Sequence, residues 1–509
     1  MALLLCIIGG MMMMSVVVSS LMDDKPEITW KLLAISVGTL AVSFECFRTT
    51  RRRPGEQRFR TGARDGYASV TLGWLLCSFV AAIPFYVCSN MTWADSIFES
   101  CSGLTTTGAS VMTPNLNLRT GFHLVGGIEG MPKGVLFWRS TLNWLGGVGI
   151  VFFIVMILPL LKVGYGKQLY NAEVPGLKTA GDQMTSRLAT SVKWTLAVYL
   201  SLTLLSMLTY WALGMTLYDA INHSFTTVST GGFSTKNDSL AYYNDHIPLQ
   251  WAVILFMFLA ACNFGLMVKL FSQRKFSFFS DEEFRFFGKT ALFAIIFTAA
   301  VLYIRRPDEL VSLGSRPSFQ HGVEAYLRTS AFHVVTAMST TGYMTSDWNT
   351  WNAPCLIMLF MLLMFPCGCG GSTCGGIKYS RIIIILKQFK YEIRHCIFPN
   401  TIQDVRLNGE RIEHDLIRKT LTFIILYVSI FVAVAAVLSL EKGVGVAEAF
   451  SGSLTCLSNV GPGYGNLGPA FGFDWLSPFS KYLLALTMII GRLELYSVLV
   501  LFLPSFWKR

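Results

Sequence analysis

Charged residues are scarce in this chain. Only 14% of its 509 residues are Asp, Glu, Lys or Arg, whereas soluble domains carry about 25%. Hydrophobic residues make up 53%, and the mean hydropathy is +0.51. This composition excludes an ordinary soluble domain and predicts an integral membrane protein. The net charge of +11 does not indicate a nucleic-acid partner, because Lys and Arg gather in short loops, as expected for the cytoplasmic side of a membrane protein.

Patterns typical of enzymes and of disulfide or metal sites are also missing. No arrangement of nucleophile and base stands out, so we do not predict an enzyme. The twelve cysteines show neither a disulfide framework nor the paired spacing of a zinc site. Cys367, Cys369 and Cys374 could ligate a soft metal, but they lie among glycines with no histidine nearby. Small-residue packing is therefore the favoured interpretation, and no covalently bound cofactor is expected.

The N-terminal segment lacks the basic start and the cleavage site of a signal peptide. It is apolar from Met1 to Leu21, so we expect a retained membrane helix. Residues 3–21 and 29–47 form a first predicted pair of spans. An arginine cluster follows, opposed only by Glu56 and Asp65, and contains Arg48, Arg51, Arg52, Arg53, Arg58, Arg60 and Arg64. This loop is predicted to be cytoplasmic, and two preceding spans place the N-terminus on the same side.

Four short polar loops containing glycine interrupt the apolar sequence. We name them the filter loops; they contain Thr106-Thr107-Gly108, Ser229-Thr230-Gly231, Thr340-Thr341-Gly342 and Asn459-Val460-Gly461. Their final glycines are separated by 123, 111 and 119 residues, which indicates a fourfold internal repeat. Four extended loops at membrane depth can turn their backbone carbonyls toward a common axis and replace the water around a cation.

Each repeat has the same order of parts, namely an apolar span, a shorter segment, the filter loop and a second span. The predicted ranges are 67–88, 94–105 and 135–161; 190–213, 217–228 and 248–271; 288–304, 324–338 and 354–388; and 414–439, 445–457 and 478–503. Segments of about 12 residues cannot cross a bilayer, so they are predicted to be re-entrant half helices.

The predicted fold is therefore an all-α membrane protein. Two N-terminal helices precede four M1-P-M2 pore-loop repeats in a pseudo-fourfold arrangement, with about 10 transmembrane helices and 4 re-entrant half helices in total. The predicted units are residues 1–66 for the helix pair and Arg-rich loop, and 67–187, 188–287, 288–412 and 413–509 for repeats 1 to 4.

Charge in the linkers predicts the orientation of the repeats. The inter-repeat linkers are basic, for example at Lys162, Lys167 and Arg274, while the segments after the third and fourth filter loops carry only Asp347 and Asp474. Arg305, Arg306 and Arg316 are an exception on the predicted outer side. The overall bias places the linkers and both termini in the cytoplasm and the filter loops toward the outside.

The half helices favour a cation over an anion. Asp95, Asp219 and Glu448 precede their filter glycines by 13, 12 and 13 residues, where a carboxylate suits the N-terminal end of a helix. Thr329 and Ser330 are the corresponding candidates in repeat 3. The opposite ends would then point at the pore axis, and each contributes roughly −0.5 charge toward a dehydrated cation.

Several segments resemble the TrkH/KtrB/HKT superfamily of potassium transporters, and its bacterial TrkH branch most closely. The segments are residues 138–161 (WRSTLNWLGGVGIVFFIVMILPLL), residues 223–235 (HSFTTVSTGGFST), Asn459 to Gly463 (NVGPG), and Gly491 to Glu494 (GRLE). The resemblance covers nearly the whole chain. It implies potassium uptake through a central pore, a homodimer in a bacterial inner membrane, and a cytoplasmic TrkA-like ring that binds a nucleotide (ATP, ADP or NAD). The nucleotide would reach the chain only through this partner.

The resemblance also bears on selectivity. In plant relatives, serine at the first filter glycine accompanies sodium preference, whereas Gly108, Gly231, Gly342 and Gly461 are all glycine here. The implied K+-binding residues are those of the four filter loops. A sodium-permeable or Na+/H+-coupled transporter of the same fold is the alternative, and a polytopic membrane enzyme or receptor is a more distant one.

Two further elements are candidates for the gate. Residues 365–378 read FPCGCGGSTCGGIK; a phosphate-binding loop is disfavoured, because Ile377 stands where that motif requires lysine. The resemblance implies instead an intramembrane gating loop at residues 366–377, hereafter the glycine-rich loop. Arg492 is a charged residue within a predicted span and should face the pore or a carboxylate. The resemblance implies that it faces the cavity near the loop as an electrostatic barrier, and the alternative is a pair with Glu494 or an extended position that reaches the interface. The candidate gate residues are Gly368, Gly370, Gly371, Ser372, Thr373, Gly375, Gly376 and Arg492.

The remaining polar residues are given structural roles. His223 and His333 are interpreted as packed or hydrogen-bonded histidines and not as a proton relay. Asn143 and Asn263 are expected to tie helices together. Lys378 and Arg381 are expected to mark the cytoplasmic end of the third repeat's second span, where they could help to dock the partner.

Overall fold

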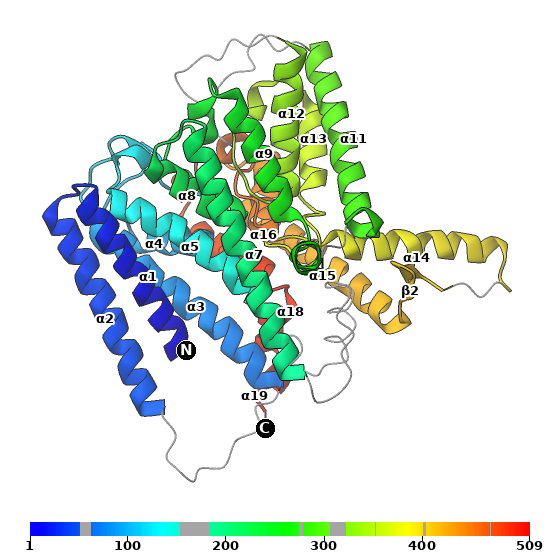
Figure 1. The fold of residues 1–509 in the computed structure, drawn as a ribbon, viewed down its shortest axis with the longest axis horizontal. Helices are drawn as coiled ribbons and strands as arrows, with labels where there is room; N and C mark the ends of the chain where they lie inside the picture. Colours follow the sequence, from blue (N-terminus) through cyan, green and yellow to red (C-terminus); the bar gives the residue numbers. More distant parts are fainter. Residues whose placement is uncertain are drawn as a thin grey trace.

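A computed structural model describes residues 1–50, 63–152, 184–273, 278–305, 322–351, 353–400, 404–468 and 470–508. Most of the predicted Arg-rich loop falls outside these residues, as do Lys162, Lys167, Arg274, Arg306 and Arg316. The described part is built from helices, with one small antiparallel hairpin that pairs Arg406 with Arg411 and Leu407 with Glu410. The predicted all-α membrane fold is confirmed (Figure 1).

The described elements follow the predicted order closely. The helices of the first half are α1 Ala2–Leu21, α2 Pro26–Thr50, α3 Ala63–Cys88, α4 Trp93–Leu104, α5 Lys133–Phe152, α7 Met184–Ala212, α8 Leu217–Val228, α9 Ile247–Ala261 and α10 Phe264–Gln273. Those of the second half are α11 Glu282–Arg305, α12 Val323–Met338, α13 Pro354–Leu363, α14 Tyr379–Ile397, α15 His414–Leu438, α16 Val446–Ser458, α17 Pro478–Arg492, α18 Tyr496–Leu499 and α19 Pro504–Trp507. The two strands are β1 Arg406–Leu407 and β2 Glu410–Arg411.

Among the described residues, six helices are long and apolar enough to cross a membrane: α1, α2, α3, α7, α11 and α15. The predicted continuous spans 248–271 and 478–503 are wrong in detail. The first bends by 100° between α9 and α10, and the second bends by 114° after Arg492. Asn263 lies at the first bend, where its side-chain oxygen accepts a hydrogen bond from the backbone N–H of Gly265 at 2.7 Å. Asn263 thus caps α10.

The half helices α4, α8, α12 and α16 pack in a cyclic order. Each contacts the first long helix of its own repeat, respectively α3, α7, α11 and α15. In addition, α4 packs between α17 and α5, α8 between α5 and α9, and α12 between α9 and α13. The half helix α16 packs against α17, and the contact of α17 with α4 brings the fourth repeat against the first.

The N-terminal helices α1 and α2 lie side by side at one edge of the molecule (Figure 1). Hydrogen bonds from Ser36 to the carbonyl of Gly9 (2.9 Å) and from Ser43 to that of Ala2 (2.8 Å) fasten the pair. The turn after α1 also supports the first repeat, because the Asp24 carboxylate accepts the N–H groups of Lys133 and Gly134 at 2.9 and 2.8 Å. These are otherwise unsatisfied donors in the first turn of α5.

Capping of the half helices follows the prediction in three repeats. Asp95 and Asp219 lie in the first turns of α4 and α8, three residues after the N-caps Thr92 and Thr216. Glu448 accepts the N–H of Gly445 at the start of α16, at 2.6 Å. The expectation for Thr329 and Ser330 is wrong, because α12 begins at Val323 and places both residues within the helix. Glu324 is the acidic residue in its first turn.

Candidate ion-conduction site

The four filter loops share one backbone conformation directly after their half helices. Thr106, Thr230, Thr340 and Asn459 are left-handed, with φ between 54° and 57°. The N–H of the next residue bonds back to a half-helix carbonyl, with distances of 2.8 to 3.0 Å; the pairs are Thr107 to Ser102, Gly231 to Thr226, Thr341 to Thr336, and Val460 to Thr455. The repeat inferred from sequence therefore has a geometric counterpart.

The loops meet in a closed ring. A Cβ added to Gly108 would overlap the carbonyl oxygen of Gly231, one at Gly232 that of Thr341, and one at Gly342 that of Val460. A Cβ at Gly461 would lie 2.6 Å from the carbonyl oxygen of Thr107, which returns the ring to the first repeat. Each glycine thus leaves room for a backbone carbonyl of the next loop, and all four have φ between 68° and 107°.

This geometry shifts the second loop by one residue. Gly232, and not Gly231, has the positive φ that Gly108, Gly342 and Gly461 share. Gly231 corresponds instead to Thr107, Thr341 and Val460, the residues whose carbonyls face the neighbouring glycines. Gly232 was missed because Thr230 is followed by two glycines, and their spacing to the other loops differs by a single residue.

Asn143 of α5 fills the space behind Gly231. A Cβ added to Gly231 would lie 2.5 Å from Cγ and 2.9 Å from Cβ of Asn143. Asn143 is fully buried, and neither of its side-chain polar atoms has a hydrogen-bond partner among the described residues. The predicted role of tying helices by hydrogen bonds is therefore wrong for Asn143, whose amide takes up the volume that a side chain fills in the other loops.

Glycines in α5 and α17 also allow these two helices to approach the ends of the half helices closely. A Cβ at Gly146 of α5 would overlap the carbonyl oxygen of Leu104, the last residue of α4, and one at Gly491 of α17 would overlap that of Leu457 near the end of α16. These contacts set the second helices of repeats 1 and 4 directly against the half-helix ends. The half-helix carbonyl ends carry partial negative charge.

A cavity of about 710 Å³ leads to one side of the ring. Gly108, Gly232, Gly342 and Pro462 contribute to its wall, as do the segments that follow the first, second and fourth filter loops. Arg139, Lys236, Asp238 and Asp474 also line it. We call this cavity the vestibule.

The glycine-rich loop lies on the half-helix side of the ring and contacts three repeats. The Thr373 hydroxyl donates to the carbonyl of Val228 at the end of α8 (3.1 Å), and the Cys374 thiol donates to that of Ser339 (3.0 Å). The N–H of Gly375 donates to the Thr340 hydroxyl at 3.1 Å. A Cβ at Gly375 would overlap the carbonyl oxygen of Ser458 in repeat 4.

Arg492 joins this loop to the remaining repeat. Its guanidinium donates to the carbonyl of Thr373 at 2.6 Å and to that of Gly146 in repeat 1 at 3.2 Å, and the residue is 2% exposed. Pairing with Glu494, the alternative considered from sequence, is not observed. Glu494 instead pairs with Arg381 at 2.6 Å.

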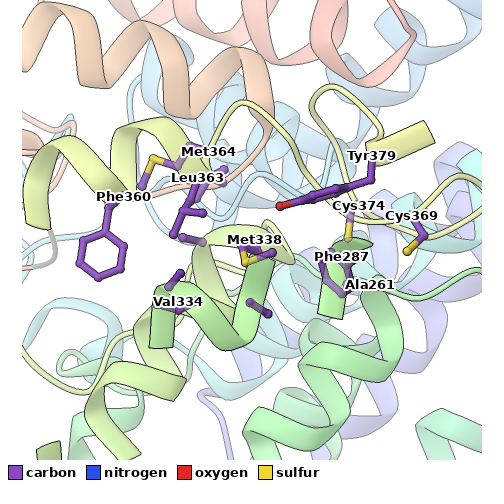
Figure 2. Packing of buried hydrophobic residues seen from close by; sticks show 14 of the residues in the cluster. Ala261, Phe287, Val334, Met338, Phe360, Leu363, Met364, Cys369, Cys374 and Tyr379 are labelled. Carbon is purple, nitrogen blue, oxygen red and sulfur yellow. The ribbon is translucent and has the colours of Figure 1, made fainter. Parts of the chain in front are cut away.

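Two expectations near the loop have different outcomes. Cys367, Cys369 and Cys374 are buried, and Cys369 and Cys374 pack with Phe287 and Tyr379 in an apolar cluster (Figure 2). This supports small-residue packing. Lys378 and Arg381, in contrast, are only 4% and 6% exposed, and Lys378 donates to the Cys374 carbonyl. Neither is exposed as a docking residue should be.

Sequence reasoning missed the residues that brace the loops from behind. Glu283 at the start of α11 accepts the N–H groups of Gly370 (2.8 Å) and Ser380 (2.7 Å), so it fastens the middle of the glycine-rich loop to the first turn of α14. Glu99 of α4 and Arg139 of α5 form an ion pair at 2.6 Å and are 0% and 2% exposed. An acidic residue within an apolar helix is the available sequence signal.

Known proteins resemble this chain in both sequence and structure. The family model described as "TrkH: Cation transport protein" matches residues 38–509. The chain belongs to the TrkH family. It is 33% identical over 473 residues to the Trk system potassium uptake protein TrkH of Salmonella typhimurium, covering 92% of this chain and 90% of that protein. It is also 33% identical to TrkG of Escherichia coli, covering 87% and 86%.

A solved structure agrees with this membership of the TrkH family. The crystal structure of the potassium transporter TrkH from Vibrio parahaemolyticus superposes with a TM-score of 0.83 at 28% identity, covering 100% of this chain and 98% of that chain. The chain is therefore a multi-pass membrane protein of a transport family and not an enzyme. The predicted superfamily and branch are confirmed.

Proposed function

We propose that this TrkH-family member takes up potassium ions through a central pore in a bacterial inner membrane. The observation that carries the proposal is the closed ring in which Gly108, Gly232, Gly342 and Gly461 adjoin carbonyl oxygens of neighbouring loops. Carbonyl rings can replace the hydration shell of a cation. The curated relatives named above, which are Trk system potassium uptake proteins, favour K+ as that cation.

The filter is assigned to all residues of the four filter loops named from sequence, together with Gly232. The C-terminal ends of α4, α8, α12 and α16 precede these loops, and their partial negative charge favours a cation near the ring. The vestibule is the proposed outer mouth. Asp238 and Asp474 contribute carboxylates to its wall, while the charges of Arg139 and Lys236 are paired with Glu99 and Asp219.

The gate is assigned to the glycine-rich loop and Arg492. The guanidinium is a fixed positive charge on the half-helix side of the ring, where it would repel an approaching cation. Its bonds to Thr373 and Gly146 tie the loop to the first repeat. Loop withdrawal would require these bonds to break, and a regulatory subunit could shift that balance.

The partners and orientation are also proposals. The curated relatives are named as proteins of a Trk system, which indicates that partner subunits exist. The family resemblance implies a homodimer with a cytoplasmic TrkA-like nucleotide-binding ring. Arg64 at the start of α3 donates to the carbonyl of Lys508 at 2.7 Å, so the end of the Arg-rich segment and the C-terminal segment lie together. With the Arg-rich loop assigned to the cytoplasm, this contact supports a cytoplasmic C-terminus.

The test is ion flux through purified protein in liposomes, with K+, Rb+ and Na+ gradients compared for the unmodified chain and for Gly108→Ser. The unmodified protein should pass K+ and Rb+ in preference to Na+. The serine should weaken that preference, because its Cβ would displace the Gly231 carbonyl. Equal K+ and Na+ flux, unchanged by the substitution, would contradict the filter assignment and favour a non-selective or sodium-coupled transporter.

A further inference from the structure

A buried ion pair joins the outer ends of two neighbouring filter loops. The Glu99 carboxylate accepts the Ser110 hydroxyl (3.0 and 3.2 Å) and the N–H of Val111 (3.0 Å). Ser110 and Val111 directly follow the first filter loop, two and three residues after Gly108. The carboxylate therefore holds the exit of this loop against α4.

Arg139 extends the same contact to the second repeat. Its Nε donates to Glu99 at 2.6 Å, while its terminal nitrogen donates to the carbonyl of Ser234 at 3.0 Å. The guanidinium carbon lies 3.4 Å from the centre of the Phe233 ring. Phe233 and Ser234 directly follow Gly232. One side chain thus fixes the exits of the first and second loops relative to each other.

The same position is used for bracing in other repeats. Glu99 precedes the left-handed residue of its loop by seven positions, and the equivalent residues are His223 and His333. His223 hydrogen-bonds the Ser234 hydroxyl at 3.0 Å, and His333 that of Ser346 at 3.0 Å. Ser234 and Ser346 each follow the filter loop of the same repeat as the histidine that they contact. This confirms the hydrogen-bonded interpretation of the two histidines.

Repeat 4 departs from this pattern. Its equivalent residue is Gly452, and the N–H of Tyr464 is instead accepted by the Ser451 hydroxyl at 3.0 Å. The brace of repeat 1 is thus the charged member of the set. It needs a counter-ion, because an unpaired buried charge is costly.

We infer that Glu99 and Arg139 are positioning residues that set cation discrimination by holding the outer ends of the first two filter loops in register. This inference rests on the proposed filter. Lysine cannot replace Arg139 in this role, because an ammonium lacks the planar fork that contacts a carboxylate, a carbonyl and a ring at once. The pair carries no net charge, so it acts through geometry.

The test compares three single variants in phosphatidylethanolamine–phosphatidylglycerol liposomes. Arg139→Lys keeps the charge but loses the fork, and Ser110→Ala removes one contact of Glu99 while leaving the ion pair intact. The control is Arg381→Lys, since Arg381 is also buried and lies 4.1 Å from the centre of the Phe423 ring, but its 2.6 Å ion pair is with Glu494 of the C-terminal segment. Rb+ and Na+ fluxes are measured for each and normalised to monodisperse protein.

The expected result is a several-fold fall in the Rb+/Na+ flux ratio for Arg139→Lys and a smaller fall for Ser110→Ala, with the ratio of Arg381→Lys unchanged. If Arg139→Lys does not fold, Ser110→Ala decides the outcome. If Arg139→Lys and Ser110→Ala both keep the wild-type Rb+/Na+ flux ratio, the inference is overturned. A wild-type protein without Rb+/Na+ discrimination would instead overturn the proposed function, so the two failures are distinguishable.

Discussion

The one-residue shift in the second filter loop leads to a prediction about two adjacent glycines. Gly231→Ala should be rescued by a second substitution, Asn143→Ala, whereas Gly232→Ala should not be rescued by any side-chain change. The reason is that different atoms occupy the space beside each glycine. A Cβ at Gly231 meets the Asn143 side chain, whereas one at Gly232 meets the backbone of Thr341, including its carbonyl carbon at 2.8 Å.

The expected magnitudes follow from these contacts. Forcing an extra methyl into a packed site typically costs about 1–3 kcal/mol, and this should be the penalty of Gly231→Ala. Asn143→Ala removes the amide group, whose Cγ lies 2.5 Å from the added methyl, and leaves only the Cβ contact at 2.9 Å; it breaks no hydrogen bond in the described structure. The double variant should therefore recover a large part of the loss. Gly232→Ala adds a left-handed cost of roughly 1–2 kcal/mol to a backbone clash.

The assay is a double-mutant cycle on purified protein. Denaturation midpoints and Rb+ uptake are measured for wild type, Gly231→Ala, Asn143→Ala and the double variant, with Gly232→Ala and Gly232→Ala/Asn143→Ala as the matched pair. A coupling of about 1–3 kcal/mol should appear in the first cycle and be absent from the second. Equal rescue of both glycines, or rescue of Gly232 alone, would refute the shifted register.

Two predictions concern the proposed gate. Arg492→Ala should raise K+ flux in the absence of any partner subunit, because it removes both the fixed charge and the tie between Thr373 and Gly146; liposome flux unchanged from wild type would count against the barrier role. Glu283→Ala should lower the denaturation midpoint and raise basal flux, because it leaves two buried N–H groups without an acceptor at a cost of about 1–3 kcal/mol each. Tighter closure in this variant would contradict an anchoring role.

Much of the architecture could be predicted because it repeats along the chain. Span length, half-helix length and polar glycine loops are local properties, and the half helix of repeat 2 was predicted at its observed bounds, 217–228. The register of the second loop was harder to predict from the sequence. In Thr230-Gly231-Gly232 either glycine gives an acceptable spacing, and the choice depends on which carbonyl each glycine faces in three dimensions.

Breaks and braces were harder to predict for other reasons. Apolar composition continues across Cys262 and Asn263, so hydropathy gives no sign of the 100° bend that Asn263 caps. Arg139 and Glu99 are 40 residues apart on different helices, and no local pattern pairs them. The alignment of Glu99 with His223 and His333 is nevertheless present in the sequence, once the left-handed residues fix the register.

The proposed gate binds the half-helix ends that lead into the filter loops. Donors of the glycine-rich loop are bonded to the carbonyls of Val228 and Ser339 at the ends of α8 and α12. These carbonyls contribute to the partial negative charge of the helix ends, which would stabilise a dehydrated cation beside the ring. While the loop is in place, Thr373 and Cys374 occupy them, and Arg492 adds a positive charge nearby. Withdrawal of the loop would thus both clear the path and return these helix ends to the ion, so in the proposed gate opening and ion stabilisation would be coupled through one set of hydrogen bonds.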